Sequence, residues 1–194
     1  MKVLVTAFEP FGDINTNCTQ MVLNEIKNIP SVSTLLLPVE NENAFNLLKT
    51  KLEENSYDYV ILLGQAANRD CISLERVALN IYDFPIADNK GVVLCDQKII
   101  SDEENALFST LPIRNIFNEL SGSNFKCEVS NSAGTYICNE LFFKGLSFTK
   151  KTKTKLGFIH FPLVKEQNCI KFTTNWTLSD LCLVTIKIMD TLVK

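Results

Sequence analysis

Residues 2–12 read KVLVTAFEPFG, an apolar run that ends in an acid, a proline and a glycine. Residues 57–69 repeat this arrangement, because YDYVILL is followed by GQAANR. Short apolar runs that stop at turn residues are typical of buried strands. We expect further strands of this kind at 125–130 and 156–161, and a less regular one at 32–39.

Helical patterns lie between these runs. They cover roughly 18–28, 42–54, 112–121 and 135–147, and a closing pattern at 178–192 places Leu181, Val184, Ile188 and Leu192 at helical spacing. Strands that alternate with helices predict an α/β layered fold, in which helices cover both faces of a central sheet.

One segment breaks this alternation. In CISLERVALNIYDF, at 71–84, one set of alternate positions holds Glu75, Val77, Leu79 and Ile81. This period of two predicts a long strand or a β-hairpin arm in place of a helix.

Length and composition limit the class of protein. The chain has 194 residues, which fits one domain spanning 1–194, and 46% hydrophobic with 21% charged residues argues against disorder. A net charge of −3 argues against general nucleic-acid binding. No apolar run approaches the length of a membrane span, and the apolar start is too short for a signal peptide. We expect a soluble cytoplasmic protein.

Metal and cofactor sites are not expected. The seven cysteines include no C-x-x-C pair, and His160 is the single histidine. The glycine-rich signatures of dinucleotide and phosphate-loop sites are absent. Most of the thiols are expected to be small buried hydrophobic groups.

Cys138 stands apart from the other cysteines, because it lies in SNSAGTYICNELFF, after a strand and within the first turns of a predicted helix. The positive end of a helix stabilises a thiolate, so we expect the pKa of this thiol to be lowered. The N–H group of Cys138 is placed to donate to an oxyanion. A buried structural cysteine is the alternative interpretation.

His160 ends the strand LGFIHFP, at the sheet edge where functional residues gather in α/β folds. Any thiol–imidazole catalysis in this chain must use it, with a third group to orient the ring. Glu75, a charge within an otherwise apolar strand, is the candidate. The alternatives are a core histidine and an exposed strand glutamate.

Seven motifs in register resemble the pyroglutamyl peptidase I family, whose members are cysteine peptidases also called pyrrolidone-carboxylate peptidases. They are VTAFEPFG at 5–12, GQAANR at 64–69, ISLERVALNI at 72–81, ADNKG at 87–91, FSTLPIR at 108–114, VSNSAGTYICN at 129–139 and GFIHFP at 157–162. The resemblance covers nearly the whole chain.

The resemblance implies a catalytic trio of Glu75, Cys138 and His160, since the family's motifs place its glutamate, cysteine and histidine at these positions. It also implies a single-domain α/β/α sandwich with a central twisted mixed sheet. The family usually forms a tetramer and needs no cofactor, so a homo-oligomer without a cofactor or metal is expected.

The implied reaction removes an N-terminal pyroglutamyl residue from a peptide. Pyroglutamate is a neutral lactam, which an apolar slot with a few backbone hydrogen bonds suits. By resemblance, the residues of this slot are Phe8, Phe11, Gln65, Ile86, Tyr136 and Ile137. The two phenylalanines would form its walls, and the backbone near Gln65 would contact the lactam amide; core packing is the alternative for the phenylalanines.

Several positions depart from the family pattern. Ala67 and Asn68 replace two glycines, Glu140 replaces a histidine, and Pro85 replaces an arginine thought to help the oxyanion site. Arg69 is a candidate helper in its place. These departures leave two alternatives: a binding or regulatory homologue with impaired catalysis, and a thiol amidase for another small acyl group.

Overall fold

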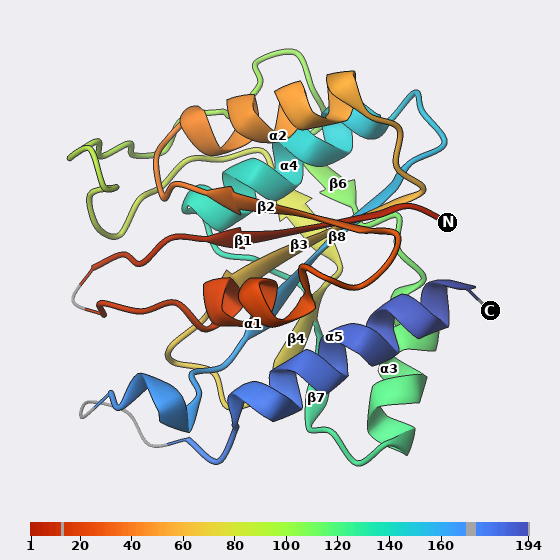
Figure 1. Ribbon diagram of the computed structural model, residues 1–194. Helices are drawn as coiled ribbons and strands as arrows, with labels where there is room; N and C mark the ends of the chain where they lie inside the picture. Colours follow the sequence, from red (N-terminus) through yellow and green to blue (C-terminus); the bar gives the residue numbers. More distant parts are fainter. Residues whose placement is uncertain (13, 170–173, 194) are drawn as a thin grey trace.

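The computed structural model describes residues 1–12, 14–169 and 174–193, and its centre is a six-stranded sheet (Figure 1). In spatial order the strands are β2 (Val32–Leu37), β1 (Val3–Phe8), β3 (Tyr59–Gln65), β8 (Lys155–Phe161), β4 (Ile72–Glu75) and β7 (Cys127–Ser130). The first four are parallel, whereas β4 runs antiparallel to β8 and parallel to β7. The sheet is therefore mixed, and the α/β prediction is confirmed.

Helices cover both faces of this sheet (Figure 1). One face carries α1 (Cys18–Ile26), α3 (Ile113–Gly122) and α5 (Leu178–Val193), and the other carries α2 (Asn43–Glu54) and α4 (Ile137–Thr149). A short 3₁₀ turn, η1 (Lys165–Gln167), follows β8. The five helices expected from the sequence all form, with ends that differ by a few residues.

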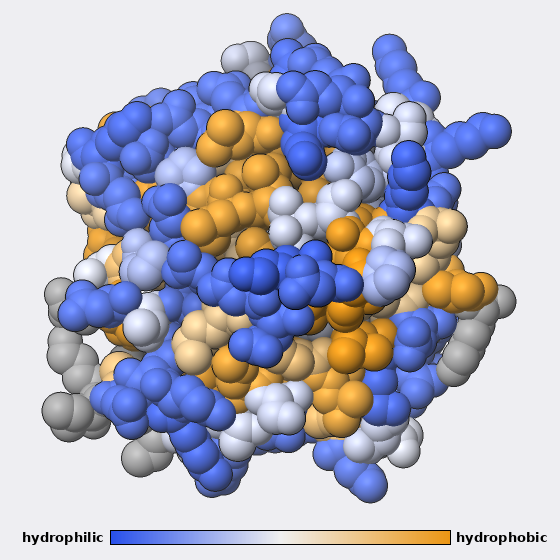
Figure 2. Space-filling model, in the orientation of Figure 1, coloured by the Kyte–Doolittle hydropathy of each residue, from blue (hydrophilic) through white to orange (hydrophobic). Residues whose placement is uncertain are grey.

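The outer surface of α5 keeps some apolar side chains in solvent. Figure 2 shows apolar groups between polar ones on the face where α1 and α5 lie. On α5, Leu183, Ile186 and Val193 are exposed.

No helix in the described part of the chain is long and apolar enough to cross a membrane.

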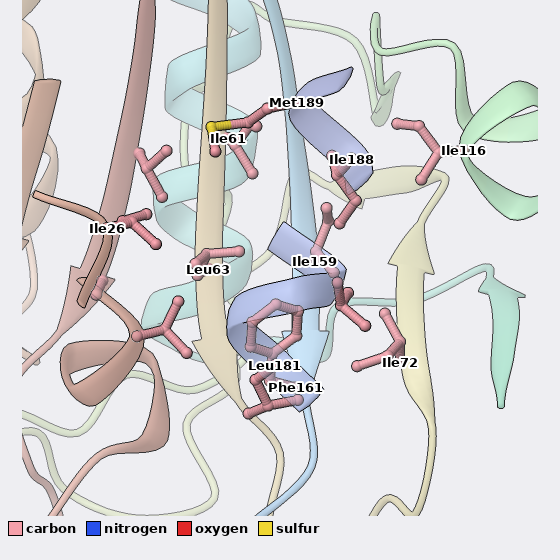
Figure 3. Packing of buried hydrophobic residues seen from close by; sticks show 14 of the residues in the cluster. Ile26, Ile61, Leu63, Ile72, Ile116, Ile159, Phe161, Leu181, Ile188 and Met189 are labelled. Carbon is pink, nitrogen blue, oxygen red and sulfur yellow. The ribbon is translucent and has the colours of Figure 1, made fainter. Parts of the chain in front are cut away.

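Side-chain alternation along the strands builds two separate cores. Ile61 and Leu63 of β3 face α5, where Figure 3 shows them gathered with Leu181, Ile188 and Met189. Val60 and Leu62, at the alternate positions of β3, face α2 and α4, together with Phe158 of β8. Strand residues are buried on both faces, which explains the nearly continuous apolar runs in the sequence.

The segment 71–84 is neither one long strand nor a hairpin arm, and that prediction is wrong. Its first half is β4 in the central sheet, and its second half is β5 (Val77–Leu79), which pairs antiparallel with β6 (Ala106–Phe108) in a separate two-stranded sheet. The change of partner occurs at Arg76, whose N–H donates to Ser130 while its carbonyl accepts from Ser109. Both halves keep a period of two, so the sequence pattern does not reveal the break.

A fork opens between β1 and β3. The two strands pair only as far as Thr6 and Leu62, although β1 continues beside β2 to Phe8 and β3 continues beside β8 to Gln65. From this point the chain passes outward from β1 to β2 on one side and from β3 to β8 on the other. Such a reversal of strand order is where α/β folds open a ligand crevice.

Candidate active site

Glu75 and His160 lie on the same face of the sheet. In the antiparallel pairing of β4 with β8, His160 is opposite Ser73 and Glu75 is opposite Phe158. Residues two apart on a strand share a face, so the two side chains meet diagonally. Glu75 Oε1 lies 2.8 Å from His160 Nδ1. This face is the one that α4 covers.

Both residues of this contact are buried. Glu75 is fully buried and His160 is 5% exposed, which excludes the reading of Glu75 as an exposed strand residue. Gly64 of β3 leaves room for the imidazole, because a Cβ atom at this position would lie 2.6 Å from Phe158 and 3.0 Å from His160 Cδ2. The Phe158 ring packs at 4.8 Å from the His160 ring.

Cys138 is the second residue of α4, and Tyr136 precedes the helix as its N-cap. The first N–H groups of a helix have no partner within the helix, so those beside the thiol are available to an oxyanion. Asn139 anchors this helix start: its side chain accepts from the N–H of Leu79 at 2.9 Å and donates to the carbonyls of Leu79 and Ile81. Among the described residues, no hydrogen bond joins the Cys138 thiol to His160.

The surroundings of Cys138 favour the protonated thiol over the thiolate. Burial, followed by the negative charge of Glu75, raises the pKa of Cys138 to about 12, although the Arg69 guanidinium acts in the opposite direction. The expectation that the helix start lowers this pKa is therefore wrong, because burial and Glu75 outweigh the helix end. Attack by this thiol requires a base that removes its proton during the reaction.

A narrow pocket opens beside Cys138, at the fork between β1 and β3. It is lined by Phe8, Phe11, Asn17, Val39, Gln65, Tyr136, Ile137 and Cys138. Five of the six residues expected to form a slot thus lie together. The space between them is about 10 Å³, roughly the room of one water molecule.

Ile86 does not line this pocket and is 48% exposed. It lies beside Ala87, whose carbonyl accepts a hydrogen bond from the Tyr136 hydroxyl at 3.0 Å. The loop that contains Ile86 therefore supports a pocket wall without the Ile86 side chain being part of it.

Two residues of the pocket were not expected from the sequence. Val39 follows β2, and Asn17 is the N-cap of α1, where its side chain accepts from the N–H of Thr19 and donates to the carbonyl of Glu9. The signal for Asn17 was present, since an asparagine before an apolar helical pattern is a typical N-cap. Val39 carries no comparable signal.

Arg69 contacts Glu75 and the loop that precedes α4. Its Nη1 donates to Glu75 Oε1 at 2.6 Å and its Nη2 donates to the carbonyl of Ser132 at 3.0 Å. Ala67 and Asn68 lie in the turn before it, and neither has a positive φ. The loss of two glycines there therefore introduces no backbone strain. Pro85 is exposed in the loop that follows Phe84.

Glu140 belongs to a buried ion pair on the next turn of the helix. Lys144 Nζ lies 3.1 Å from Glu140 Oε1 and 2.5 Å from Glu42 Oε1. Burial raises the pKa of Glu140, and the charge of Lys144 acts against this shift. Glu42 is the N-cap of α2, so this cluster connects α4 to the start of α2.

Metal ligands are not grouped in the described residues: no cluster of three or more histidine, cysteine, aspartate or glutamate side chains is placed to hold an ion.

Comparisons with known proteins find relatives of this chain along nearly its full length. The family model described as pyroglutamyl peptidase matches residues 1–189. Pyrrolidone-carboxylate peptidase 1 of Caldanaerobacter subterraneus subsp. tengcongensis is 40% identical and covers 100% of this chain, which spans 97% of that protein. The pyrrolidone-carboxylate peptidase of Brachyspira hyodysenteriae is 38% identical, with coverage of 100% and 98%.

A solved structure shares the fold. The crystal structure of pyroglutamyl peptidase I from Bacillus amyloliquefaciens superposes with a TM-score of 0.94 at 28% identity, covering 98% of this chain and 93% of that one.

Proposed function

The chain belongs to the pyroglutamyl peptidase family, and we propose that Cys138, His160 and Glu75 carry out its reaction. As a member of this family it is a cysteine peptidase that removes N-terminal pyroglutamate from peptides. The observation that carries the assignment of residues is the 2.8 Å contact between Glu75 and His160, on the face where Cys138 begins a helix beside the pocket.

The reaction begins with attack of Cys138 Sγ on the pyroglutamyl carbonyl carbon. Because the thiol is protonated, His160 Nε2 takes its proton as the C–S bond forms. Glu75 holds His160 through Nδ1, which leaves Nε2 facing the site and stabilises the imidazolium. The N–H of Cys138 donates to the oxyanion of the tetrahedral intermediate.

Collapse of the intermediate breaks the C–N bond. His160 gives its proton to the leaving amine, and a pyroglutamyl thioester remains on Cys138. Water then attacks the thioester while His160 accepts a proton from it, and the thiol is regenerated with release of pyroglutamate.

The fork between β1 and β3 suits the lactam ring. The N–H of Ala66 donates to Phe161 on the β8 side, so the N–H and carbonyl of Gln65 point to the other side, where β1 no longer pairs. They are therefore placed to bind the lactam carbonyl and N–H. The Gln65 side chain serves the scaffold, since its Oε1 accepts from Cys18 and Gln167.

The pocket must widen to admit the substrate, because its space is about 10 Å³. Phe8 and Ile137 are buried, whereas Phe11 and Tyr136 are partly exposed. Outward rotation of these two rings is the route by which we expect the lactam to enter between Phe8 and Cys138.

Replacement of the thiol tests the proposal. Turnover of a pyroglutamyl coumarin amide should be lost in Cys138→Ala, and Cys95→Ser, a change at an exposed thiol, should keep wild-type turnover. Persistent hydrolysis by Cys138→Ala would remove the proposed nucleophile. A panel of other N-blocked amides tests the thiol amidase alternative, which a preference for a non-lactam group would favour.

We further propose a single peptidase domain over residues 1–194, a cytoplasmic location and assembly into a homo-oligomer, the family's usual state. The exposed apolar side chains of α5 support the last of these, since apolar surface in contact with solvent is typical of an interface.

A further inference from the structure

The guanidinium of Arg69 connects parts of the site that come from different loops. Arg69 donates to Glu75 Oε1 at 2.6 Å and to the carbonyl of Ser132 at 3.0 Å. The same oxygen of Glu75 contacts His160 Nδ1 at 2.8 Å. Ser132 lies in the loop between β7 and α4 and therefore leads into Cys138.

The chain holds Arg69 firmly in this place. A tight turn precedes it, in which its N–H donates to the carbonyl of Ala66. The residue after it, Asp70, accepts a hydrogen bond on its carbonyl from Trp176 Nε1 at 2.9 Å and forms an ion pair with Lys126. Because the backbone of Arg69 and that of Asp70 are both hydrogen-bonded, the backbone helps to direct the guanidinium toward Glu75.

Charge balance gives this contact a consequence for the reaction. Glu75 is fully buried, and its Oε2 has no hydrogen-bond partner among the described residues. A buried carboxylate without a cation is strongly disfavoured. In the proposed role of general base His160 supplies a positive charge only after it takes the thiol proton, whereas an arginine is cationic at every stage.

We propose that Arg69 is a positioning residue for the reaction, which directs the Glu75 carboxylate at His160 while it holds the loop that leads into Cys138. This inference rests on the proposed triad. Each Nη donates to a group of the protein, one to Glu75 and the other to Ser132, so we infer that Arg69 acts through these two residues.

Three variants test the role: Arg69→Gln, Arg69→Lys, and Arg114→Gln as a matched control on the exposed surface of α3. We expect Arg69→Gln to lower kcat about 100-fold with KM within about threefold, because a misplaced catalytic group affects the chemical step more than binding. Arg69→Lys keeps the charge but reaches only one partner, and should recover at least about tenfold of the loss. Arg114→Gln should match wild type.

The pH profile of kcat separates this role from a merely structural one. Loss of the cation leaves the charge of Glu75 to favour protonated His160, which cannot accept the thiol proton, so the profile of Arg69→Gln should move to higher pH and that of Arg69→Lys should not. A fall in activity with an unmoved profile would overturn the proposal. Should Arg69→Gln fail to fold, Arg69→Met removes the same charge, and wild-type kcat with an unmoved pH profile in that variant would overturn the proposal as well.

A double-mutant cycle with Glu75→Gln tests the route of action. If Arg69 acts through Glu75, adding Arg69→Gln to Glu75→Gln should cost less than about threefold. An equal cost in both backgrounds would show that Arg69 acts elsewhere. Cys138→Ala distinguishes the two levels of the argument: activity in that variant would refute the triad, whereas wild-type kinetics in Arg69→Gln would refute only the positioning role.

Discussion

Glu75 has two opposing effects on the chemistry at the scale of single residues. It orients His160 through a 2.8 Å contact, yet its negative charge, after burial, raises the pKa of the thiol that must be deprotonated. A site with a protonated resting thiol relies on His160 as a general base and does not hold a preformed thiolate. The two effects of Glu75 are separable by experiment.

We expect Glu75→Gln to make Cys138 more reactive toward iodoacetamide while hydrolysis falls roughly 10³-fold or more. Removing the charge lowers the thiol pKa. Each unit by which this pKa falls should raise the rate of alkylation about threefold, because the gain in thiolate is partly offset by the lower nucleophilicity of that thiolate. Loss of the imidazole orientation accounts for the fall in hydrolysis. Mass spectrometry of the labelled peptides measures the rate, with the exposed Cys95 as internal reference. Slower labelling at Cys138 would mean that Glu75 stabilises a thiolate.

Gly64 gives a second prediction at this scale. Its substitution by alanine places a Cβ atom 2.6 Å from Phe158 and 3.0 Å from His160, so the imidazole must shift. We expect kcat to fall about 10- to 100-fold and the free energy of unfolding to drop by about 1–3 kcal/mol. Gly122→Ala is the control, since nothing lies within 4 Å of a Cβ there. Wild-type kcat in Gly64→Ala would show that the ring position tolerates displacement.

At the scale of elements, the turn around Asp88 connects the pocket wall to the start of α2. Asp88 accepts from the N–H groups of Asn41 at 2.7 Å and of Lys90 and Val92, each at 2.8 Å. Burial alone would raise the pKa of Asp88, but these N–H groups hold it below its usual value. The carboxylate is therefore more stable in the folded chain than in the unfolded one.

We expect Asp88→Asn to destabilise the fold by about 2–3 kcal/mol at pH 7, or about 5–10 °C in Tm, because its amide places a donor opposite a backbone N–H. A carboxyl whose pKa is lowered on folding stabilises above its unfolded pKa, near 4, and loses this contribution as the pH falls below it. The gap between variant and wild type in thermal unfolding should therefore shrink below pH 4. Asp102→Asn, at an exposed site, should show no gap; a gap for Asp88→Asn that persists in acid would contradict this assignment.

The sequence predicts the regular elements well, because Leu62 and its neighbours lie in strands buried on both faces and such strands leave unbroken apolar runs. The proposed trio of Glu75, Cys138 and His160 was predictable only from motifs, since a buried Glu75 and an exposed one give the same alternation. The division of 71–84 between two sheets was not predictable, because it depends on Ser130 and Ser109, which bond Arg76 from distant segments. The raised pKa of Cys138 was missed for a similar reason: burial depends on packing that a single segment does not encode.

At the scale of the whole molecule, the two faces of the sheet have different tasks. Glu75 and His160 lie on the face under α2 and α4, and the pocket opens at the end of the sheet, where Asn17 and Gln65 line it as well, whereas the face under α1, α3 and α5 is mostly an apolar core. Because none of the described residues of α5 lines the proposed site, the outer side of this helix can contact another copy of the chain without blocking the pocket. None of the exposed apolar side chains of α5 lines the pocket.

The last prediction concerns assembly. Sedimentation equilibrium should give a mass that is a multiple of the 21.9 kDa chain. Leu183 and Ile186 lie one turn apart on the outside of α5, at 45% and 37% exposure. Changing both to lysine should lower the assembled mass, since like charges facing each other across an interface repel.

The control for this test is the double change Asn46→Lys and Thr50→Lys on α2, which adds the same charge to exposed positions on the opposite side of the sheet. It should leave the mass unchanged, and thermal unfolding should show both variants folded. A wild-type chain that sediments as a monomer would contradict assembly itself. If instead only the α2 variant dissociates, the copies meet through the face that carries the active site, and the pocket beside Cys138 then lies near the interface.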